Sequence, residues 1–206
     1  MNILIIGANG FTGRRILNDL VAREIYNITA CSLRNDIKSD DGYQFIRADI
    51  RNVSEVRALF KEVCPDVVIN TSALSVPDFC ETHHNEARAT NITAVEHLAR
   101  ACEQYGSRFI HLSTDFVFDG RTDRLYTEED EPNPVNYYGI TKLEGEERVA
   151  ECCGNYAIVR VVVVYGKALP GQHGNIVQLV ANKLRSGETI RVVSDQWRTP
   201  TFVGDI

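Results

Sequence analysis

Short apolar runs alternate with amphipathic segments along most of the chain. Apolar runs that are too short for helices predict buried strands at residues 2–7, 27–33, 44–50, 66–70, 108–113 and 156–166. Between them, apolar residues recur every three or four positions and predict helices at residues 11–23, 53–63, 85–106 and 137–152. Because strands and helices alternate along the sequence, the strands should lie parallel, with helices on both faces of the sheet and right-handed crossover connections. The pattern therefore predicts an α/β fold with a doubly wound parallel sheet.

A glycine-rich loop follows the first predicted strand. Gly7, Gly10 and Gly13 have G-x-x-G-x-x-G spacing in the stretch GANGFTG, where the first predicted helix begins. Glycine allows a tight turn and a close backbone approach, and a helix N-terminus offers free N–H groups with a partial positive charge. This loop predicts a site for the pyrophosphate of a dinucleotide, and with it a Rossmann-type fold.

The end of the second predicted strand should meet the 2′ position of the adenosine ribose. An acidic residue there suits the ribose diol of NAD, whereas a basic residue suits the 2′-phosphate of NADP. The stretch CSLRND places Ser32 and Arg34 at this point and favours NADP(H), although Asp36 is close enough to keep NAD(H) open. Asp49 and Ile50, at the end of the third predicted strand, are placed to border the adenine.

Composition narrows the possible partners. The 206 residues carry a net charge of −6 without a basic cluster, which argues against nucleic acid or an anionic membrane as the main partner. We expect no signal peptide before the first strand, and no apolar stretch approaches the ~18 residues of a membrane span. The six cysteines form no C-x-x-C pair and no zinc-type group, so we expect a cytoplasmic protein with reduced thiols and no metal. His111 is expected to pack in the core rather than to act in catalysis.

The stretch YYGITK at residues 137–142 is a candidate for chemistry. Tyr138 and Lys142 are four residues apart and share a helix face, whereas Tyr137 points away. An ammonium group beside a phenol favours the phenolate, so Lys142 should lower the pKa of Tyr138 from its usual ~10. That would prepare Tyr138 to exchange a proton near neutral pH. Taken alone, the pair also fits two ordinary side chains on a helix surface.

Three separated motifs together resemble the extended short-chain dehydrogenase/reductase family, and within it the dTDP-4-dehydrorhamnose reductases. The glycine loop is followed by STDFVFDG (113–120) with NPVNYYGITKLEGE (133–146), and then by DQWRTPT (195–201). The resemblance covers essentially the whole chain. It implies a Rossmann domain over residues 1–166 and a reductase that uses NADPH on the C4 carbonyl of a nucleotide-linked keto sugar.

The resemblance also implies roles for single residues. Thr114, Tyr138 and Lys142 would be the catalytic triad, in which Tyr138 gives the proton and Lys142 holds the nicotinamide ribose. The cofactor-binding residues would be Gly7, Gly10, Phe11, Gly13, Arg34, Asp49, Ile50, Ala73, Leu74, Asn91, Tyr138 and Lys142. The residues near the nucleotide-sugar substrate would be Val76, Asp115, Tyr138 and Gln196.

The chain departs from the reductase pattern at two positions. Val163 stands where the reductases have a tryptophan that is expected to pack on the sugar, and Arg198 replaces a glycine. Both changes leave the reaction type in place but put the identity of the sugar in doubt. Residues 167–206 are expected to hold only the start of a C-terminal substrate-binding lobe that is truncated relative to the family. The resemblance also leaves a homodimer open.

Other activities fit parts of the pattern. A sugar-nucleotide 4,6-dehydratase would need an Asp-Glu pair after the triad threonine, but Asp115 is followed by Phe116. A 4-epimerase would need a tightly held NAD, against which Arg34 argues mildly. A non-catalytic NADP-binding subunit, like the regulatory subunit of methionine adenosyltransferase, fits the loss of the tryptophan better than it fits the retained triad.

Overall fold

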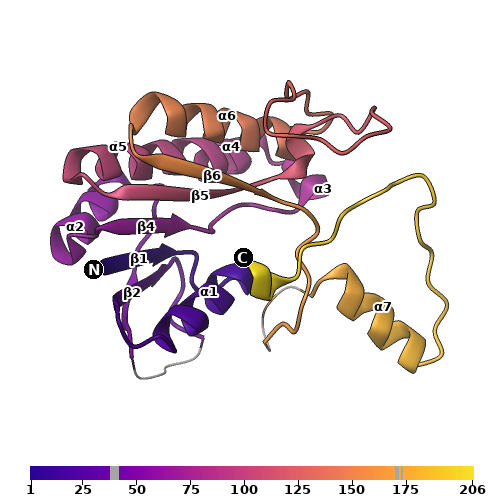
Figure 1. The fold of residues 1–206 in the computed structure, drawn as a ribbon, viewed down its shortest axis with the longest axis horizontal. Helices are drawn as coiled ribbons and strands as arrows, with labels where there is room; N and C mark the ends of the chain where they lie inside the picture. The colour runs from indigo at the N-terminus through magenta and orange to yellow at the C-terminus, as the bar shows by residue number, and fades with distance from the viewer. Residues whose placement is uncertain (38–41, 170–171, 173) are drawn as a thin grey trace.

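A parallel sheet forms the centre of the molecule. The computed structural model describes residues 1–37, 42–169, 172 and 174–206, and within them the sheet has six strands in the order β3-β2-β1-β4-β5-β6. The strands are β1 (Asn2–Ile6), β2 (Asn27–Ser32), β3 (Gln44–Arg47), β4 (Val67–Asn70), β5 (Arg108–Thr114) and β6 (Tyr156–Val161) (Figure 1). The order reverses between β1 and β4, as in doubly wound nucleotide-binding folds, so the predicted fold class is confirmed.

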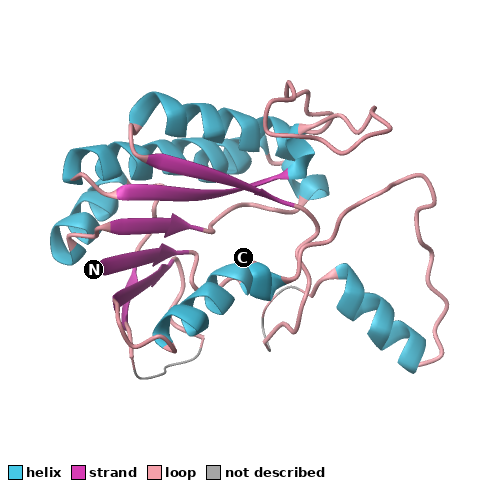
Figure 2. Cartoon of the chain, in the orientation of Figure 1, coloured by secondary structure: helices cyan, strands magenta, loops and turns pink. Residues whose placement is uncertain are grey.

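Helices cover both faces of this sheet (Figure 2). They are α1 (Phe11–Val21), α2 (Val53–Val63), α3 (Pro77–Cys80), α4 (His84–Arg88), α5 (Ala94–Tyr105), α6 (Tyr137–Cys152) and α7 (Ile176–Arg185), with a π-helical turn η1 (Ala89–Thr93) and 3-10 turns η2 (Asp115–Val117) and η3 (Val203–Asp205). The side chains of Asn52 and Asn136 begin α2 and α6 by accepting hydrogen bonds from backbone N–H groups. Helices α2, α5 and α6 pack on one face, and α1 packs on the other.

Strand β1 shows why the central strands carry apolar side chains on both faces. Leu4 and Ile6 contribute to the core under α2, α5 and α6, whereas Ile3 and Ile5 pack with Leu17 of α1. All five side chains are almost fully buried. Burying an aliphatic side chain of this size stabilises the fold by about 1.5–3 kcal/mol. The sheet is therefore a rigid support for the residues at its carboxyl-terminal edge.

The long helix predicted at residues 85–106 is interrupted. It consists of α4, the π-helical turn η1 and α5 in succession. The backbone of η1 lies against α6, where a side chain on Gly145 would overlap the carbonyl oxygen of Asn91. Because the turn widens where α6 packs closely, its cause is tertiary and no local apolar pattern reveals it.

The last predicted strand, at residues 156–166, is wrong in its second half. Strand β6 ends at Val161, and Val163 adopts a positive φ of 40°. A positive φ is unusual for a β-branched residue, and it turns the chain out of the sheet. β3 is also shorter than predicted and ends at Arg47, so Asp49 and Ile50 lie in the connection to α2.

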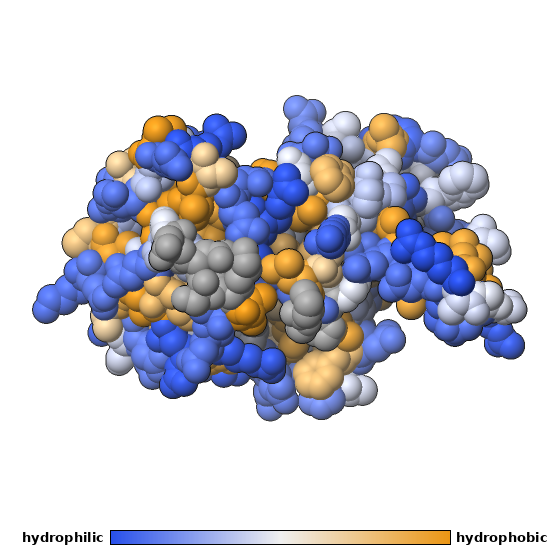
Figure 3. All heavy atoms as spheres, turned by 90° about the horizontal axis from the view of Figure 1, so that it is seen from below, coloured by the Kyte–Doolittle hydropathy of each residue, from blue (hydrophilic) through white to orange (hydrophobic). Residues whose placement is uncertain are grey.

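After β6 the chain leaves the sheet, carries α7 and returns (Figure 1). The return is held where the N–H of Tyr165 donates to the carbonyl oxygen of Thr201 at 2.9 Å and the N–H of Val203 donates to that of Tyr165 at 2.8 Å. Helix α7 has no buried residue, and Trp197 is 93% exposed. Figure 3, a view from below, shows hydrophobic patches across that face of the molecule, separated by hydrophilic side chains. The domain boundary predicted at residue 166 stays a prediction.

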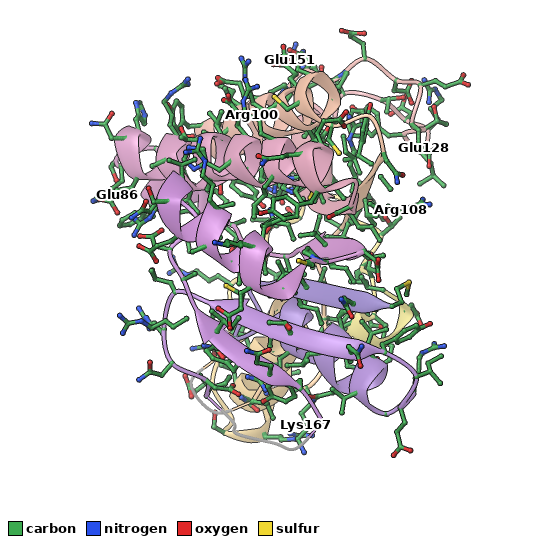
Figure 4. The ribbon with its side chains drawn as sticks, turned by 90° about the vertical axis from the view of Figure 1, so that its left-hand side faces the viewer. Glu86, Arg100, Arg108, Glu128, Glu151 and Lys167 are labelled. Atoms are coloured by element: carbon green, nitrogen blue, oxygen red, sulfur yellow. The ribbon has the colours of Figure 1, made fainter. Side chains whose placement is uncertain are left out.

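Charged side chains are spread over the surface of the helical layer. Labelled side chains such as Glu86, Arg100 and Glu151 lie at the periphery of the helical layer (Figure 4). No helix among the described residues has the length and apolar character needed to cross a membrane. The six cysteines are free, and the described part of the chain holds no group of three or more His, Cys, Asp or Glu residues suited to a metal ion.

Candidate active site

The candidate residues gather at the carboxyl-terminal edge of the sheet. Gly7 follows β1, Ser32 ends β2, Asn70 ends β4 and Thr114 ends β5. In a parallel sheet these ends share one edge, and ligands bind in the crevice where the strand order reverses. That point lies between β1 and β4, so the glycine loop stands at its centre.

The glycine loop forms a cradle without side chains. Gly7 has a φ of 81°, and a Cβ atom there would lie 2.8 Å from the backbone nitrogen of Ser72. A Cβ atom on Gly13 would overlap the carbonyl oxygen of Gly7. Gly10 is the N-cap of α1 and has no side chain that could cap the N–H groups of the first turn. The helix itself begins at Phe11, directly after the loop. These features fit a pyrophosphate group bound at a helix N-terminus.

One residue from the C-terminal excursion also reaches this loop. The Nε2 atom of Gln172 donates to the carbonyl oxygens of Asn9 at 3.1 Å and Gly10 at 3.0 Å. The sequence separation exceeds 160 residues, so no local signal could have pointed to this contact.

A buried network lies beyond the end of β2. Arg14, 2% exposed, forms an ion pair with one oxygen of Asp36, and the hydroxyl of Tyr43 donates to the other oxygen at 2.6 Å. Asn9 holds the neighbouring backbone by donating to the carbonyl oxygen of Arg34 at 3.3 Å. The carboxylate of Asp36 is thus engaged inside the protein, while Arg34 is exposed at the strand end. Sequence reasoning singled out Asp36 and Arg34 but missed Arg14 and Tyr43.

The residues expected near adenine have partners of their own. Asp49 accepts hydrogen bonds from the guanidinium of Arg51, one of them at 2.7 Å, and this contact lowers the pKa of the Asp49 carboxyl. Ile50 is buried, and its carbonyl oxygen contacts Nδ1 of His97 at 3.1 Å. Their placement against adenine stays a prediction.

Tyr138 lies in a small apolar cluster behind the edge. It is 8% exposed and packs with Cys80, Leu74 and Phe116, whose ring meets it edge-on at 5.6 Å. Burial raises the pKa of Tyr138 to about 12, while a hydrogen bond with Thr114 acts in the opposite direction. The structure therefore brings Thr114 and Tyr138 together.

Lys142 does not lower the pKa of Tyr138 as expected. Its Nζ atom donates to the carbonyl oxygen of Leu112 at 2.8 Å and lies 3.2 Å from Nε2 of His111. The groups that shift the pKa of Tyr138, besides burial, are Thr114 and neighbouring acidic groups, and Lys142 is not among them. The spacing in the helix was right, but the amino group of Lys142 points to β5 rather than to the phenol. Its role at the nicotinamide ribose stays a prediction.

His111 is buried, as expected of a core residue, but both of its ring nitrogens also make hydrogen-bond contacts. Nδ1 lies 3.0 Å from Nδ2 of Asn70, and Nε2 faces Lys142. Burial and the charge of Lys142 hold the pKa of His111 well below its usual range, so the ring is neutral. The sequence alone could not place Asn70 beside His111, because the contact depends on the register of β4 with β5.

Asn91 joins three parts of the site. Its Oδ1 atom accepts from the N–H of Leu74 at 2.8 Å, and its Nδ2 atom donates to the carbonyl oxygen of Leu74 at 3.1 Å and to the hydroxyl of Thr141 at 3.0 Å. Asn91 thereby fixes the backbone after β4, where Ala73 and Leu74 are expected to bind the cofactor. Contact of Asn91 with the cofactor stays a prediction.

The expected substrate side is more open. The carboxylate of Asp115 forms an ion pair with Arg198, whose guanidinium also lies 4.6 Å from the centre of the Phe116 ring. Val76 is 45% exposed at the start of α3, and Gln196 lies on the exposed segment after α7. Arg198, noted in the sequence only as a departure, is the residue that brings this segment to Asp115, which follows Thr114 in the chain.

The sheet, the glycine loop and the reversal of strand order define the chain as a Rossmann-type NAD(P)-binding fold. A family model described as RmlD substrate binding domain matches residues 1–206. The chain belongs to this family.

Relatives and solved structures agree with this placement. The chain is 36% identical, over 100% of its length and 68% of the relative, to the probable low-salt glycan biosynthesis reductase Agl14 of Haloferax volcanii. It is 31% identical to dTDP-4-dehydrorhamnose reductase of Shigella flexneri (98% and 62% covered) and 30% identical to methionine adenosyltransferase 2 subunit beta of Danio rerio (99% and 60%). The NADP complex of dTDP-4-dehydrorhamnose reductase from Bacillus anthracis superposes with a TM-score of 0.86 at 31% identity, covering 98% of this chain and 66% of that one. The chain thus spans roughly two thirds of these relatives.

Proposed function

We propose that the chain forms the cofactor-binding and catalytic part of an NADPH-dependent reductase. The substrate would be the 4-keto group of a nucleotide-linked deoxysugar, as in dTDP-4-dehydrorhamnose reductase, and the reaction would interconvert a carbonyl and a CH–OH group. The observation that carries the proposal is Tyr138, buried beside Thr114 at the edge that also holds the glycine cradle. The names of the reductase relatives support the choice of substrate class.

The high pKa of Tyr138 suits the role of proton donor. A phenol with a pKa of about 12 keeps its proton at neutral pH and can donate it when negative charge grows on a nearby oxygen. Thr114 would donate a second hydrogen bond to the same oxygen, which stabilises that charge. The bound nicotinamide would supply the hydride, and the protein would position the sugar and exclude water. The lowering of the Tyr138 pKa by Lys142, expected from the sequence, is not needed for this direction of reaction.

The cofactor-binding residues favour NADPH over NADH in this proposal. The carboxylate of Asp36 is held by Arg14 and Tyr43, so it is not presented to a ribose diol. Arg34 is exposed nearby and could meet a 2′-phosphate. This arrangement supports NADP(H) and speaks against a 4-epimerase with a tightly held NAD.

A binding subunit without catalysis is the second candidate. It is favoured by the 30% identity to methionine adenosyltransferase 2 subunit beta. Phe116 packs against Tyr138 at the position where a dehydratase would need its second carboxylate, so that reaction has less support. The two remaining candidates differ in turnover, which can be measured directly.

The test is NADPH oxidation by the full-length protein with dTDP-4-dehydrorhamnose, beside NADH. Tyr138→Phe should lower turnover by ~10²- to 10⁴-fold and leave NADPH affinity unchanged. Tyr137→Phe is the matched control, because Tyr137 stacks on His84 with ring centres 3.8 Å apart and should keep full turnover. Tight NADPH binding without turnover by the wild type would favour the binding subunit. Turnover that survives in Tyr138→Phe would exclude Tyr138 as the acid.

A further inference from the structure

A row of buried polar groups runs from β4 through β5 to α6, behind the catalytic edge. The backbone N–H of Ser72 donates to Oδ1 of Asn70 at 3.0 Å, and Nδ2 of Asn70 lies 3.0 Å from Nδ1 of His111. Nε2 of His111 lies 3.2 Å from Nζ of Lys142, which donates to the carbonyl oxygen of Leu112 at 2.8 Å. Asn70 and His111 are fully buried, and Lys142 is 1% exposed, so water cannot easily replace any of these contacts.

The direction of each hydrogen bond follows from the first one. A backbone N–H only donates, so the oxygen of the Asn70 amide must face Ser72 and the NH₂ group must face His111. That NH₂ group also only donates, so Nδ1 of His111 must accept. A neutral imidazole carries one proton, which therefore sits on Nε2 and points at Lys142.

The proton on Nε2 of His111 requires a hydrogen-bond acceptor, and the atom it faces is Nζ of Lys142. An ammonium group has three donors and no lone pair, so a charged Lys142 would oppose two donors across 3.2 Å. A neutral amine satisfies both contacts, because it accepts from His111 and donates to Leu112.

The charges around Lys142 are compatible with this state. Glu146, one turn further along α6, favours the ammonium, but its carboxylate is already held by Arg160 of β6 with a shortest contact of 2.6 Å. Tyr138 on the same helix is uncharged at neutral pH. Burial lowers the pKa of Lys142 to about 8, in the direction the hydrogen bonds demand.

We propose that His111 is a positioning residue that favours the neutral amine of Lys142 in the ligand-free protein, through a one-way chain of hydrogen bonds starting at the backbone N–H of Ser72. The inference deepens the proposed function and rests on it, since Lys142 is the residue expected at the nicotinamide ribose. A charged Lys142 that reaches a ribose hydroxyl must leave Nε2 of His111 and take up a proton. Nucleotide binding and protonation of Lys142 are thereby coupled.

The experiment is ¹⁵N NMR of the histidine rings in the ligand-free protein at a pH of about 9. The chemical shifts distinguish a nitrogen that carries a proton from one that does not. The signal of His111 is assigned by its loss in His111→Asn or, if that variant does not fold, by elimination with variants of the other histidines. We expect a proton on Nε2 and none on Nδ1. A proton on Nδ1, or on both nitrogens, would overturn the proposal.

Asn70→Asp should reverse the direction of the hydrogen bonds between residue 70, His111 and Lys142, with almost no change in the shape of the side chain. A carboxylate only accepts, so Nδ1 of His111 should take the proton, Nε2 should accept, and Lys142 should stay charged to higher pH. The added charge alone could raise the pKa of Lys142, but it would not move the ring proton, so an unchanged tautomer would contradict the proposal. Asn155→Asp, at an exposed asparagine, is the control and should leave the ring as in the wild type. Because no ligand or turnover is needed, failure of the reductase assay leaves this result intact.

Discussion

The two sides of the candidate active site are built in different ways. The cofactor side comes from the sheet and its helices, where Tyr138 and Lys142 are at most 8% exposed. The substrate side comes partly from the excursion after β6, where α7 has no buried residue and Arg198 keeps 30% of its side chain exposed. The groups that would carry the reaction are therefore rigidly placed, whereas those that would choose the sugar lie on a lightly packed segment. A change of substrate would need few changes in the sheet-built side.

The ion pairs show the same difference. Glu146 and Arg160 form a bidentate pair in which the carboxylate is 5% exposed. Lys183 and Glu188, at the end of α7, pair at 3.0 Å with both side chains open to water. Removing one partner of a buried pair leaves an uncompensated charge, whereas exposed pairs contribute little.

The largest expected effect follows from that contrast. Glu146→Ala should lower the free energy of unfolding by about 3 kcal/mol, because the Arg160 guanidinium loses its carboxylate in a partly buried place. Glu188→Ala should leave the urea midpoint unchanged within error. Equal effects of the two substitutions in urea unfolding would contradict the idea that only the sheet-built side is tightly packed.

Glycine substitutions test the backbone in the same manner. Gly13→Ala should destabilise the protein by about 2 kcal/mol and weaken NADPH binding, because the new methyl group overlaps the carbonyl oxygen of Gly7. Gly174→Ala is the partner substitution, since among the described residues its Cβ would meet only Gln178, at 3.9 Å. Thermal unfolding and fluorescence titration with NADPH measure both effects. A Gly13→Ala protein that binds NADPH normally would show that the cradle is not where the pyrophosphate lies.

The pH dependence of stability should carry the signature of Lys142. Its pKa of about 8 in the folded protein lies below the ~10.4 of an unfolded lysine, so between these values the unfolded chain binds more protons. Stability must then rise with pH in this window, and the contribution is lost below it. Relative to Lys142→Met, the wild type should gain ~2 kcal/mol of unfolding free energy between a pH of about 8 and 10. Lys183→Met, at the exposed lysine of α7, should keep the pH dependence of the wild type.

The smallest expected effect is at Arg198. Arg198→Gly removes a partly exposed ion pair with Asp115 and should change stability by less than about 1 kcal/mol. Under the proposed function it should alter KM for the nucleotide sugar several-fold while kcat changes little, because Thr114, Tyr138 and Lys142 stay in place. Arg191→Gly, on the same exposed segment, is the control. A large loss of kcat in Arg198→Gly alone would mean that this segment takes part in the reaction.

The fold could be predicted from the sequence because it depends on local patterns. Helix α6 has the predicted bounds, and the sheet follows from the alternation of apolar runs with amphipathic helices. The errors have tertiary causes. The valines after Val161 have the composition of a strand, but Val163 turns the chain away, and η1 widens where α6 packs against it.

In the candidate site, too, local features could be predicted from the sequence and tertiary contacts could not. Glycine spacing and the four-residue step from Tyr138 to Lys142 are local, so the sequence could point to them. The partners of Lys142 and Asp36 lie on other elements, and which way a side chain turns depends on what those elements offer. For Lys142 the carbonyl oxygen of Leu112 and the ring of His111 decide the direction.

The hydrogen bonds between Tyr165, Thr201 and Val203 join the two ends of the excursion. The excursion is therefore a loop closed at its ends. Its length has little effect on the stability of the sheet, since doubling the length of a loop costs only about 0.6 kcal/mol in closure entropy. Insertions, deletions or exchange of α7 with that of a relative should be tolerated by the fold as long as these ends still meet. If the proposed reductase function holds, this excursion is the part of the chain that can be exchanged to change the sugar specificity while the sheet and the glycine loop stay the same.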